Sequence, residues 1–377
     1  MKQQKIQLAT VFSGIGAIEF AFKRLAIPYD LVFACDNGER EIKYNKAEEK
    51  KKVNSFKRIS SKTNYIRKLY SSKTKKKNFV ELSYLANYPE MTPQKYYEDI
   101  YLLNGKYYKG KVDLLMGGSP CQSFSTVGKQ LGLEDTRGTL FYEFARLVKQ
   151  IKPKVFIYEN VRGLMTNNKG QTLETILRIL EKEFKYNISY GLFNATEFNI
   201  PQNRRRLLIV GTLDDIGFNV NDIKRQELTR EVRDFLEDNC IDGGFTSNGN
   251  GGLIISQEKG HPNEKAILSP LVTKYVLSGG TKNFYTKPVT DLPIARTLLK
   301  TMGNHHRAGV DNYITVDKDR NLYRALTPRE CLRLMGFTDD FKIVVPWGKA
   351  YMQIGNSIVV DMLIAVVRLL IERKAFD

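Results

Sequence analysis

The chain has 377 residues and is 42% hydrophobic, so it is long enough for two domains and apolar enough to bury a sizeable core. Its net charge of +18 fits a polyanionic partner and a lysine-rich, solvated surface about equally well. No apolar run approaches the roughly 18 residues that cross a bilayer. The N-terminus lacks a signal-peptide pattern, and the 4 Cys and 3 His form no zinc pattern, so we expect a cytoplasmic protein without membrane contact or metal.

Strands and helices alternate along most of the chain. Residues 6–12 predict a buried strand, residues 17–25 an amphipathic helix and residues 31–36 a second strand. Further strands are predicted at 112–118, 155–160, 188–193 and 207–212, and further helices at 140–151, 171–184 and 357–374. Such alternation is typical of α/β folds with a doubly wound, mostly parallel sheet, in which ligands bind at the carboxyl ends of the strands.

Two stretches interrupt this alternation. Residues 43–111 form a basic insert, in which 18 Lys or Arg stand against 6 Asp or Glu, a net charge of +12. Its lysine runs, 50–52 and 75–77, could neutralise phosphates but cannot read bases, and the alternative interpretation is a solvated loop. Residues 214–323 are rich in Gly, Asn and Asp with weak periodicity, which predicts a second, smaller domain with long loops.

A glycine loop follows the first predicted strand. Phe12, Gly14 and Gly16 lie between that strand and the next helix, where glycines allow the backbone to approach a ligand closely. Asp36 ends the second strand, where an acidic residue typically holds ribose hydroxyls. These residues indicate a nucleoside cofactor, and they do not by themselves separate NAD from S-adenosylmethionine.

Cys121 lies just past the carboxyl end of the predicted strand 112–118, in a turn of small residues and proline. This accessible position favours a nucleophile, whereas Cys35 and Cys331 are interpreted as small buried hydrophobic residues.

Charged residues mark the ends of two more strands. Glu159 ends the strand 155–160, where a carboxylate with a raised pKa can act as an acid, although a solvated or helix-capping glutamate is the simpler interpretation. Arg204 and Arg206 precede the strand 207–212, and their alternation places both on one face, either in the cleft or at a basic edge near phosphate.

Together these motifs resemble those of the bacterial DNA cytosine-C5 methyltransferases, and they occur in that family's order between residues 12 and 357. The matching blocks are Phe12-Ser13-Gly14-Ile15-Gly16, Glu98-Asp99-Ile100, Gly118-Ser119-Pro120-Cys121-Gln122, Arg137-Gly138-Thr139-Leu140-Phe141, Glu159-Asn160-Val161, Gln202-Asn203-Arg204-Arg205-Arg206, Arg324-Ala325-Leu326-Thr327-Pro328-Arg329-Glu330, Met335-Gly336-Phe337 and Gln353-Ile354-Gly355-Asn356-Ser357. The sequence departs from the family at Asp36, where Glu is more usual, and in the long insert between the cofactor blocks.

The resemblance implies a Rossmann-like, S-adenosylmethionine-dependent methyltransferase domain at 1–213 and 337–377, which carries the insert 43–111, and a smaller, loop-rich target-recognition domain at 214–336. It implies methyl transfer to carbon 5 of a flipped-out cytosine through a covalent Cys121 adduct. The implied catalytic residues are Cys121, Glu159 and Arg204. The implied cofactor-binding residues are Phe12, Gly14, Gly16, Asp36, Asp99, Ile100, Asn356 and Ser357. The implied DNA-binding residues are Gln122, Ser123, Ser125, Arg206, Thr297 and Leu298.

The expected substrate is double-stranded DNA, methylated by a monomer to protect host DNA in a restriction–modification system, with a restriction endonuclease that forms no stable complex with it. The nearest alternative is the same chemistry on tRNA, which the large variable recognition region disfavours. An inactive DNA-binding relative would be expected to lack Cys121 or Glu159. An NAD-dependent oxidoreductase would leave the proline-cysteine and Glu-Asn-Val blocks unexplained, and a zinc deaminase would lack its metal ligands.

Overall fold

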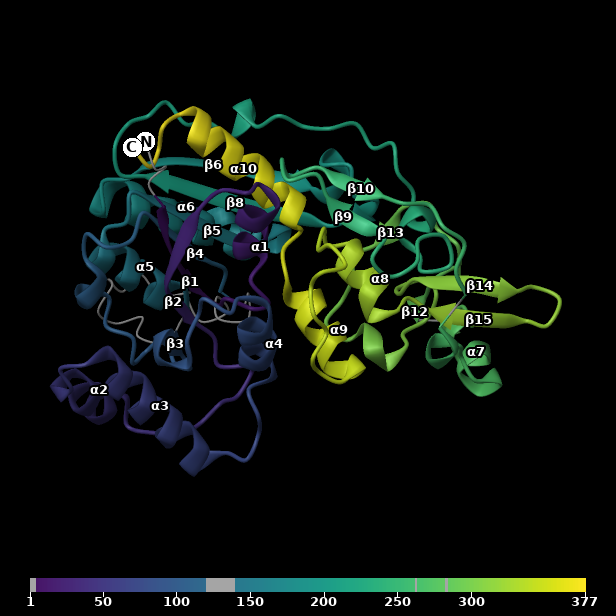
Figure 1. Ribbon diagram of the computed structural model, residues 1–377, viewed down its shortest axis with the longest axis horizontal. Coiled ribbons are helices and arrows are strands. Elements are labelled where there is room, and N and C mark those ends of the chain that lie inside the picture. The colour runs from purple at the N-terminus through teal and green to yellow at the C-terminus, as the bar shows by residue number, and fades with distance from the viewer. Residues whose placement is uncertain (1–4, 120–139, 262, 282–283) are drawn as a thin grey trace.

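The computed structural model describes residues 5–119, 140–261, 263–281 and 284–377 (Figure 1). Its centre is a seven-stranded sheet in the order β3-β2-β1-β4-β5-β8-β6. The strands are β1 (Ile6–Val11), β2 (Tyr29–Cys35), β3 (Tyr96–Tyr97), β4 (Leu114–Gly117), β5 (Val155–Val161), β6 (Asn187–Asn194) and β8 (Arg205–Thr212). Neighbouring strands are parallel except at β8, which is antiparallel to both β5 and β6. The predicted doubly wound, mostly parallel α/β sheet is confirmed.

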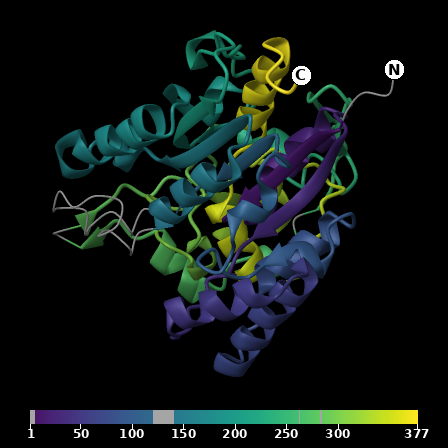
Figure 2. The ribbon, with the colours of Figure 1, turned by 90° about the vertical axis from the view of Figure 1, so that its left-hand side faces the viewer.

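Helices cover both faces of this sheet (Figures 1 and 2). Successive strand residues point to opposite faces, so Leu8 and Leu114 pack in one buried cluster while Ala9 and Leu115 pack in another. The first cluster includes α1 (Ala17–Arg24) and α10 (Val360–Glu372), and the second includes α5 (Leu140–Ile151) and α6 (Gln171–Arg178). The sheet is therefore the middle layer of three, and the carboxyl ends of its strands are where we expect a ligand-binding site.

One stretch near the C-terminus is more apolar than the sequence analysis expects. The stretch Trp347–Glu372 is apolar and long enough to cross a membrane, with a mean hydropathy of 2.1 in its best window. It consists of two helices, α9 (Trp347–Asn356) and α10, and 67% of that window is buried inside the protein. Its apolar residues belong to the cluster that covers the sheet, which accounts for their hydropathy by core packing.

The basic insert is folded. It forms α2 (Lys46–Ser55), α3 (Ile59–Lys73) and α4 (Phe79–Asn87); in Figure 1, α2 and α3 lie at the lower left and α4 lies nearer the centre, beside α9, while Figure 2 shows the insert at the bottom of the molecule. Asn45 and Asn78 cap α2 and α4 with their side-chain oxygens, as helix N-termini require. Tyr84 is buried in the first core cluster and Tyr70 in the second. The insert therefore does not fit the alternative of a solvated loop.

The smaller domain has its own small core of Leu268, Val276, Ala308 and Tyr313. Around it lie α7 (Pro270–Val276) and the hairpin of β14 (Tyr313–Asp317) and β15 (Leu322–Ala325). The remaining short strands are β7 (Gln202–Asn203), β9 (Phe245–Ser247), β10 (Leu253–Ile255), β11 (Gly280–Thr281), β12 (Phe284–Tyr285) and β13 (Ala295–Arg296). Segments 232–245 and 331–335 contribute side chains to the large core instead, so we propose narrower bounds, about 268–325, than the predicted 214–336.

The block that begins at Arg324 has a structural explanation. Thr327 and Glu330 form a capping box at the start of α8 (Pro328–Arg333), and the carboxylate of Glu330 also receives two hydrogen bonds from Arg324. Both partners of this ion pair are fully buried, so removal of Arg324 would leave the charge of Glu330 uncompensated in the core. This motif therefore stabilises the join between the smaller domain and the sheet.

Candidate active site

The glycine loop lies at the carboxyl end of β1 and adopts a left-handed backbone, which glycine accepts without strain. Phe12, Gly14 and Gly16 have φ angles of 53°, 54° and 78°. The amides of Gly14 and Gly38 donate to the two oxygens of the Asp36 carboxylate at 3.0 and 2.8 Å. Burial raises the pKa of Asp36, and these two hydrogen bonds lower it. The loop after β1 and the residue after β2 are thus held together, as the sequence predicts.

Asp99 follows β3 at the same edge of the sheet and is only 4% exposed. Its Oδ1 accepts from the amide of Tyr101 at 2.8 Å, and its Oδ2 accepts from the hydroxyls of Tyr44 and Tyr70 at 2.5 and 3.0 Å. Burial raises the pKa of this carboxyl group, while the three hydrogen bonds oppose the shift. Ile100 is buried beside it, in the same cluster that Phe12 packs against.

The last sequence block reaches this region from the end of α9. The Asn356 amide donates to Glu39 at 2.9 Å, three residues past Asp36 in the chain. Ser357 is buried, and its carbonyl oxygen accepts a hydrogen bond from Arg204. The structure therefore brings residues from both ends of the chain to the edge that Asp36 occupies.

These residues fit a nucleoside ligand. A Cβ on Gly14 would face open space, with nothing nearer than the Phe12 carbonyl oxygen at 4.0 Å. Carboxylates at the ends of β2 and β3 offer acceptors for ribose hydroxyls and for an exocyclic amine. The buried Ile100 and half-buried Phe12 give apolar surface beside them. This combination suits an adenosyl group, and S-adenosylmethionine carries one.

The neighbouring strands β4 and β5 build the second part of the site. A Cβ on Gly118 would lie 2.7 Å from Oε2 of Glu159, so only glycine permits the chain leaving β4 to pass this close to the carboxylate. Ser119 is the last described residue before the predicted nucleophile. The predicted residues of the following loop lie outside the described residues: Cys121, Gln122, Ser123 and Ser125.

Two residues to which the sequence analysis assigns no role of their own hold the start of that loop. The amide of Asn160 donates to the Ser119 carbonyl at 3.0 Å, and the hydroxyls of Ser119 and Tyr158 lie 2.6 Å apart. Both partners come from β5, the sheet neighbour of β4. The direction in which the chain enters the loop is thus set by the strand that carries Glu159.

Glu159 is paired with Arg206. Arg206 Nε lies 2.9 Å from Glu159 Oε1, and the β5–β8 register places Arg206 opposite Val161. Burial raises the pKa of the Glu159 carboxyl group, and the positive charges of Arg206 and then Arg204 oppose that rise. Arg206 is thus a partner of the candidate acid, and its predicted contact with DNA stays a prediction.

Arg204 has a different environment. Its guanidinium group donates to the carbonyl oxygens of Leu298, Gly355 and Ser357 at 3.0, 2.8 and 2.6 Å, and the residue is 1% exposed. A buried arginine whose donors bind three backbone carbonyl oxygens fixes the positions of those backbone segments. These bonds show that Arg204 positions the last block, and its predicted catalytic role stays a prediction.

The predicted DNA contacts Thr297 and Leu298 lie at the joint between the domains. The Thr297 hydroxyl donates to the Asn203 carbonyl, and the Leu298 amide donates to the Gln202 side chain at 3.1 Å. Leu298 is only 2% exposed, because it packs into the large core. We propose that this pair fixes the smaller domain against β7 rather than contacting DNA through the Leu298 side chain.

Glu19, on α1 beneath the glycine loop, is fully buried and accepts hydrogen bonds from Thr10 and Tyr84. Burial is the main cause that raises its pKa from 4.5 to about 7. Between these two values the native state holds a proton that the unfolded state releases, so the contribution of Glu19 to stability is complete below pH 4.5 and is lost as pH rises towards 7. We expect this loss to be about 3 kcal/mol and to be absent in Glu19→Gln. Urea unfolding at several pH values measures it, and parallel curves for the two proteins would contradict it.

The chain is similar to known methyltransferases along nearly its whole length. A family model described as C-5 cytosine-specific DNA methylase matches residues 6–372. The type II methyltransferase M1.ScrFI of Lactococcus lactis subsp. cremoris is 38% identical over 267 residues, 69% of this chain and 62%, or under two thirds, of that relative. M.HpaII of Haemophilus parainfluenzae is 32% identical over 308 residues, 77% of this chain and 80% of that relative.

Solved structures agree on the fold. The Dnmt2 methyltransferase of S. pombe matches with a TM-score of 0.66 and 18% identity, covering 98% of this chain and 99% of its own. A putative DNA modification methyltransferase encoded within an E. coli prophage matches with a TM-score of 0.61 and 19% identity, again over 98% and 99%. At these identities the likeness concerns the fold, whereas the family model concerns the sequence blocks. This chain belongs to the C-5 cytosine-specific DNA methylase family.

Proposed function

We propose that the protein transfers the methyl group of S-adenosylmethionine to carbon 5 of a cytosine in duplex DNA, through a covalent adduct with Cys121. Family membership supports the reaction and the methyl donor, which is general to this family. The observation that carries the proposal is the largely buried Glu159 carboxylate, whose side chain is 14% exposed, paired with Arg206 and next to Gly118 at the start of the proline-cysteine loop.

The chemistry requires a nucleophile and an acid on opposite sides of one ring. Carbon 5 of cytosine is a poor nucleophile, and addition of the Cys121 thiolate to carbon 6 makes it enamine-like. S-adenosylmethionine, when bound, supplies the electrophilic methyl group. A base then removes the carbon-5 proton, and elimination of the Cys121 thiolate restores the aromatic ring.

In this proposal Glu159 donates a hydrogen bond to ring nitrogen 3, where negative charge develops as the thiolate adds. The raised pKa of the buried Glu159 favours the protonated form that can donate. Arg206 donates a hydrogen bond to Oε1 of Glu159 and so leaves Oε2 to carry the proton, and Arg204 holds the backbone of the last block in place. Asp36 and Asp99 would hold the ribose and the adenine.

A base stacked in a duplex cannot reach such a site, so the target cytosine must flip out. We propose that Gln122, Ser123 and Ser125 contact the opened duplex and that the smaller domain reads the sequence. The type II methyltransferase relatives support a role in restriction–modification. We propose that the protein acts as a monomer on DNA in the cytoplasm, separately from any restriction endonuclease.

The test compares duplex DNA with tRNA as methyl acceptors. Purified protein is incubated with labelled S-adenosylmethionine and each nucleic acid, and the product nucleosides are separated and identified by mass spectrometry. We expect 5-methyl-2′-deoxycytidine from DNA and none of the ribonucleoside from tRNA. Methylation of tRNA alone would contradict the proposal and favour the RNA enzyme, and methylation of neither would reject both.

A further inference from the structure

The insert's tyrosines occupy one oxygen of the carboxylate that ends β3. Tyr44 precedes α2 and Tyr70 lies in α3, and both donate their hydroxyls to Oδ2 of Asp99. Tyr70 is 3% exposed, and its ring lies under the guanidinium group of Arg40, with 4.9 Å between them. The carboxylate is thus held between two phenols on one oxygen and the Tyr101 amide on the other.

The insert also holds the glycine loop. The Tyr88 hydroxyl lies 3.1 and 2.5 Å from the carbonyl oxygens of Ile15 and Gly16. A Cβ on Gly16 would lie 2.3 Å from the Tyr88 ring, so the loop and this side chain pack without spare room. Asn78, which caps α4, donates its amide to the Asp36 carbonyl at 3.0 Å.

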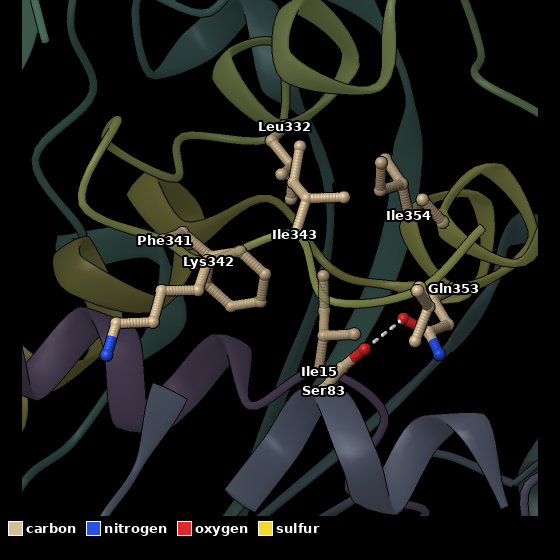
Figure 3. Close-up of a pocket in the computed structure, with 10 residues that line it drawn as sticks. Ile15, Ser83, Leu332, Phe341, Lys342, Ile343, Gln353 and Ile354 are labelled. Atoms are coloured by element: carbon tan, nitrogen blue, oxygen red, sulfur yellow. Dashed lines mark hydrogen bonds between the residues drawn. The ribbon is translucent and has the colours of Figure 1, made fainter. Parts of the chain in front are cut away.

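A third contact joins the insert to the last sequence block. Ser83 of α4 donates to Gln353 of α9 at 2.8 Å, beside Ile15 of the glycine loop (Figure 3). The insert therefore touches the elements around the proposed cofactor site from three sides. Its lysine runs, by contrast, are largely exposed, so their predicted contact with phosphates stays a separate prediction.

Hydrogen bonds to a buried carboxylate have two effects. They offset the cost of removing the charge from water, and they fix the directions in which the remaining lone pairs point. At Asp99 the hydroxyls of Tyr44 and Tyr70 lower the pKa that burial raises, so they favour the anionic form. An exocyclic adenine amine needs such a fixed acceptor.

We infer that the insert serves the cofactor site, and that Tyr44 and Tyr70 are positioning residues that hold Asp99 as an oriented acceptor for the adenosyl group. This inference rests on the proposed cofactor site. It assigns to residues 44–88, the part of the insert that precedes the cofactor residues Asp99 and Ile100, a role in cofactor affinity that its basic charge does not suggest. Phosphate contact through the lysine runs would act on DNA affinity instead.

The experiment titrates the full-length protein with S-adenosylhomocysteine in a calorimeter, without DNA. In the Tyr44→Phe/Tyr70→Phe double variant, phenylalanine keeps the rings and removes only the hydroxyls. We expect Kd to rise roughly 10- to 100-fold, with a matching rise in KM for S-adenosylmethionine and kcat changed by less than about twofold. DNA affinity should stay at the wild-type value.

Tyr65→Phe is the matched control. Tyr65 belongs to the same insert and donates at 2.6 Å to a different carboxylate, that of Glu49, so its loss should leave Kd unchanged. In an Asp99→Asn background the tyrosine changes should add little, because they act through Asp99. Thermal unfolding checks that the double variant is folded. If it is not, the single variant Tyr44→Phe is used instead, because Tyr44 is only half-buried and its replacement should perturb the fold less.

The possible results distinguish the proposed cofactor site from the positioning role of Tyr44 and Tyr70. Failure of the wild-type protein to bind S-adenosylhomocysteine would remove the proposed cofactor site itself. Tight wild-type binding that the folded tyrosine variants retain would overturn the positioning role alone. Equal weakening by Tyr65→Phe, or weakening that adds fully to that of Asp99→Asn, would show a general effect on the insert and would also overturn it.

Discussion

Cys121→Ala should abolish methyl transfer, lowering kcat on the order of 10⁴-fold or more, because no other group can add to carbon 6 and activate carbon 5. Its affinity for S-adenosylhomocysteine should remain that of the wild type, since the proposed cofactor residues lie at the ends of β1, β2 and β3 and of α9. Initial rates of methyl incorporation into duplex DNA measure the first effect, and calorimetry measures the second.

Cys240→Ala is the control for this prediction. Cys240 is fully buried and burial raises the pKa of its thiol, so it is not available as a thiolate and its replacement should leave the rate unchanged. Residual activity of Cys121→Ala within tenfold of wild type, on the order of 1.4 kcal/mol in barrier height, would show that the covalent route is not the main one.

Glu159→Ala should lower kcat roughly 10²- to 10³-fold, the usual cost of removing one preorganised donor. The pH profile gives a sharper test. If the protonated carboxyl group donates to the base, the rate is present below the pKa of Glu159 and falls as pH rises through it. Burial raises that pKa above its ordinary value, so the alkaline fall moves towards neutral pH.

Glu159→Gln separates donation from titration. The amide donates without ionising, so the variant should be slower than wild type and lack the alkaline fall that belongs to Glu159. Glu372→Gln, at an exposed ion pair with Lys224, should alter neither the rate nor its pH profile. An unchanged alkaline fall in Glu159→Gln would show that another group titrates, and the proposed role of Glu159 would then be wrong.

Local patterns predicted the sheet and its glycine loop, because a strand, a turn and a helix each depend on the pattern of a few consecutive residues. The β1 strand, the α1 helix and the position of Asp36 follow this rule. The insert helices were missed, since α2 has few apolar residues and is defined mainly by its Asn45 cap and by packing of Val53. Charge alone suggested a DNA contact there, and the packing shows a folded layer.

Long-range contacts were beyond the sequence. Alternation placed Arg204 and Arg206 on one face, but only the register of β5 with β8 decides that Arg206 meets Glu159. Asn160 was noticed only as part of a block, and its hydrogen bond to Ser119 depends on β4 lying beside β5. Tyr70 and Asp99 are likewise 29 residues apart in the chain, and no local pattern pairs them.

The most direct test of the covalent mechanism uses a duplex that carries 5-fluorocytosine in place of cytosine at the methylated position. Fluorine cannot leave carbon 5 as a proton does, so the enzyme should remain bonded to carbon 6 after methyl transfer. We expect a denaturant-stable complex that requires S-adenosylmethionine, and a peptide map that places the adduct on Cys121. A protein that methylates ordinary DNA but forms no such complex, or forms it on Cys35, Cys240 or Cys331, would contradict this account.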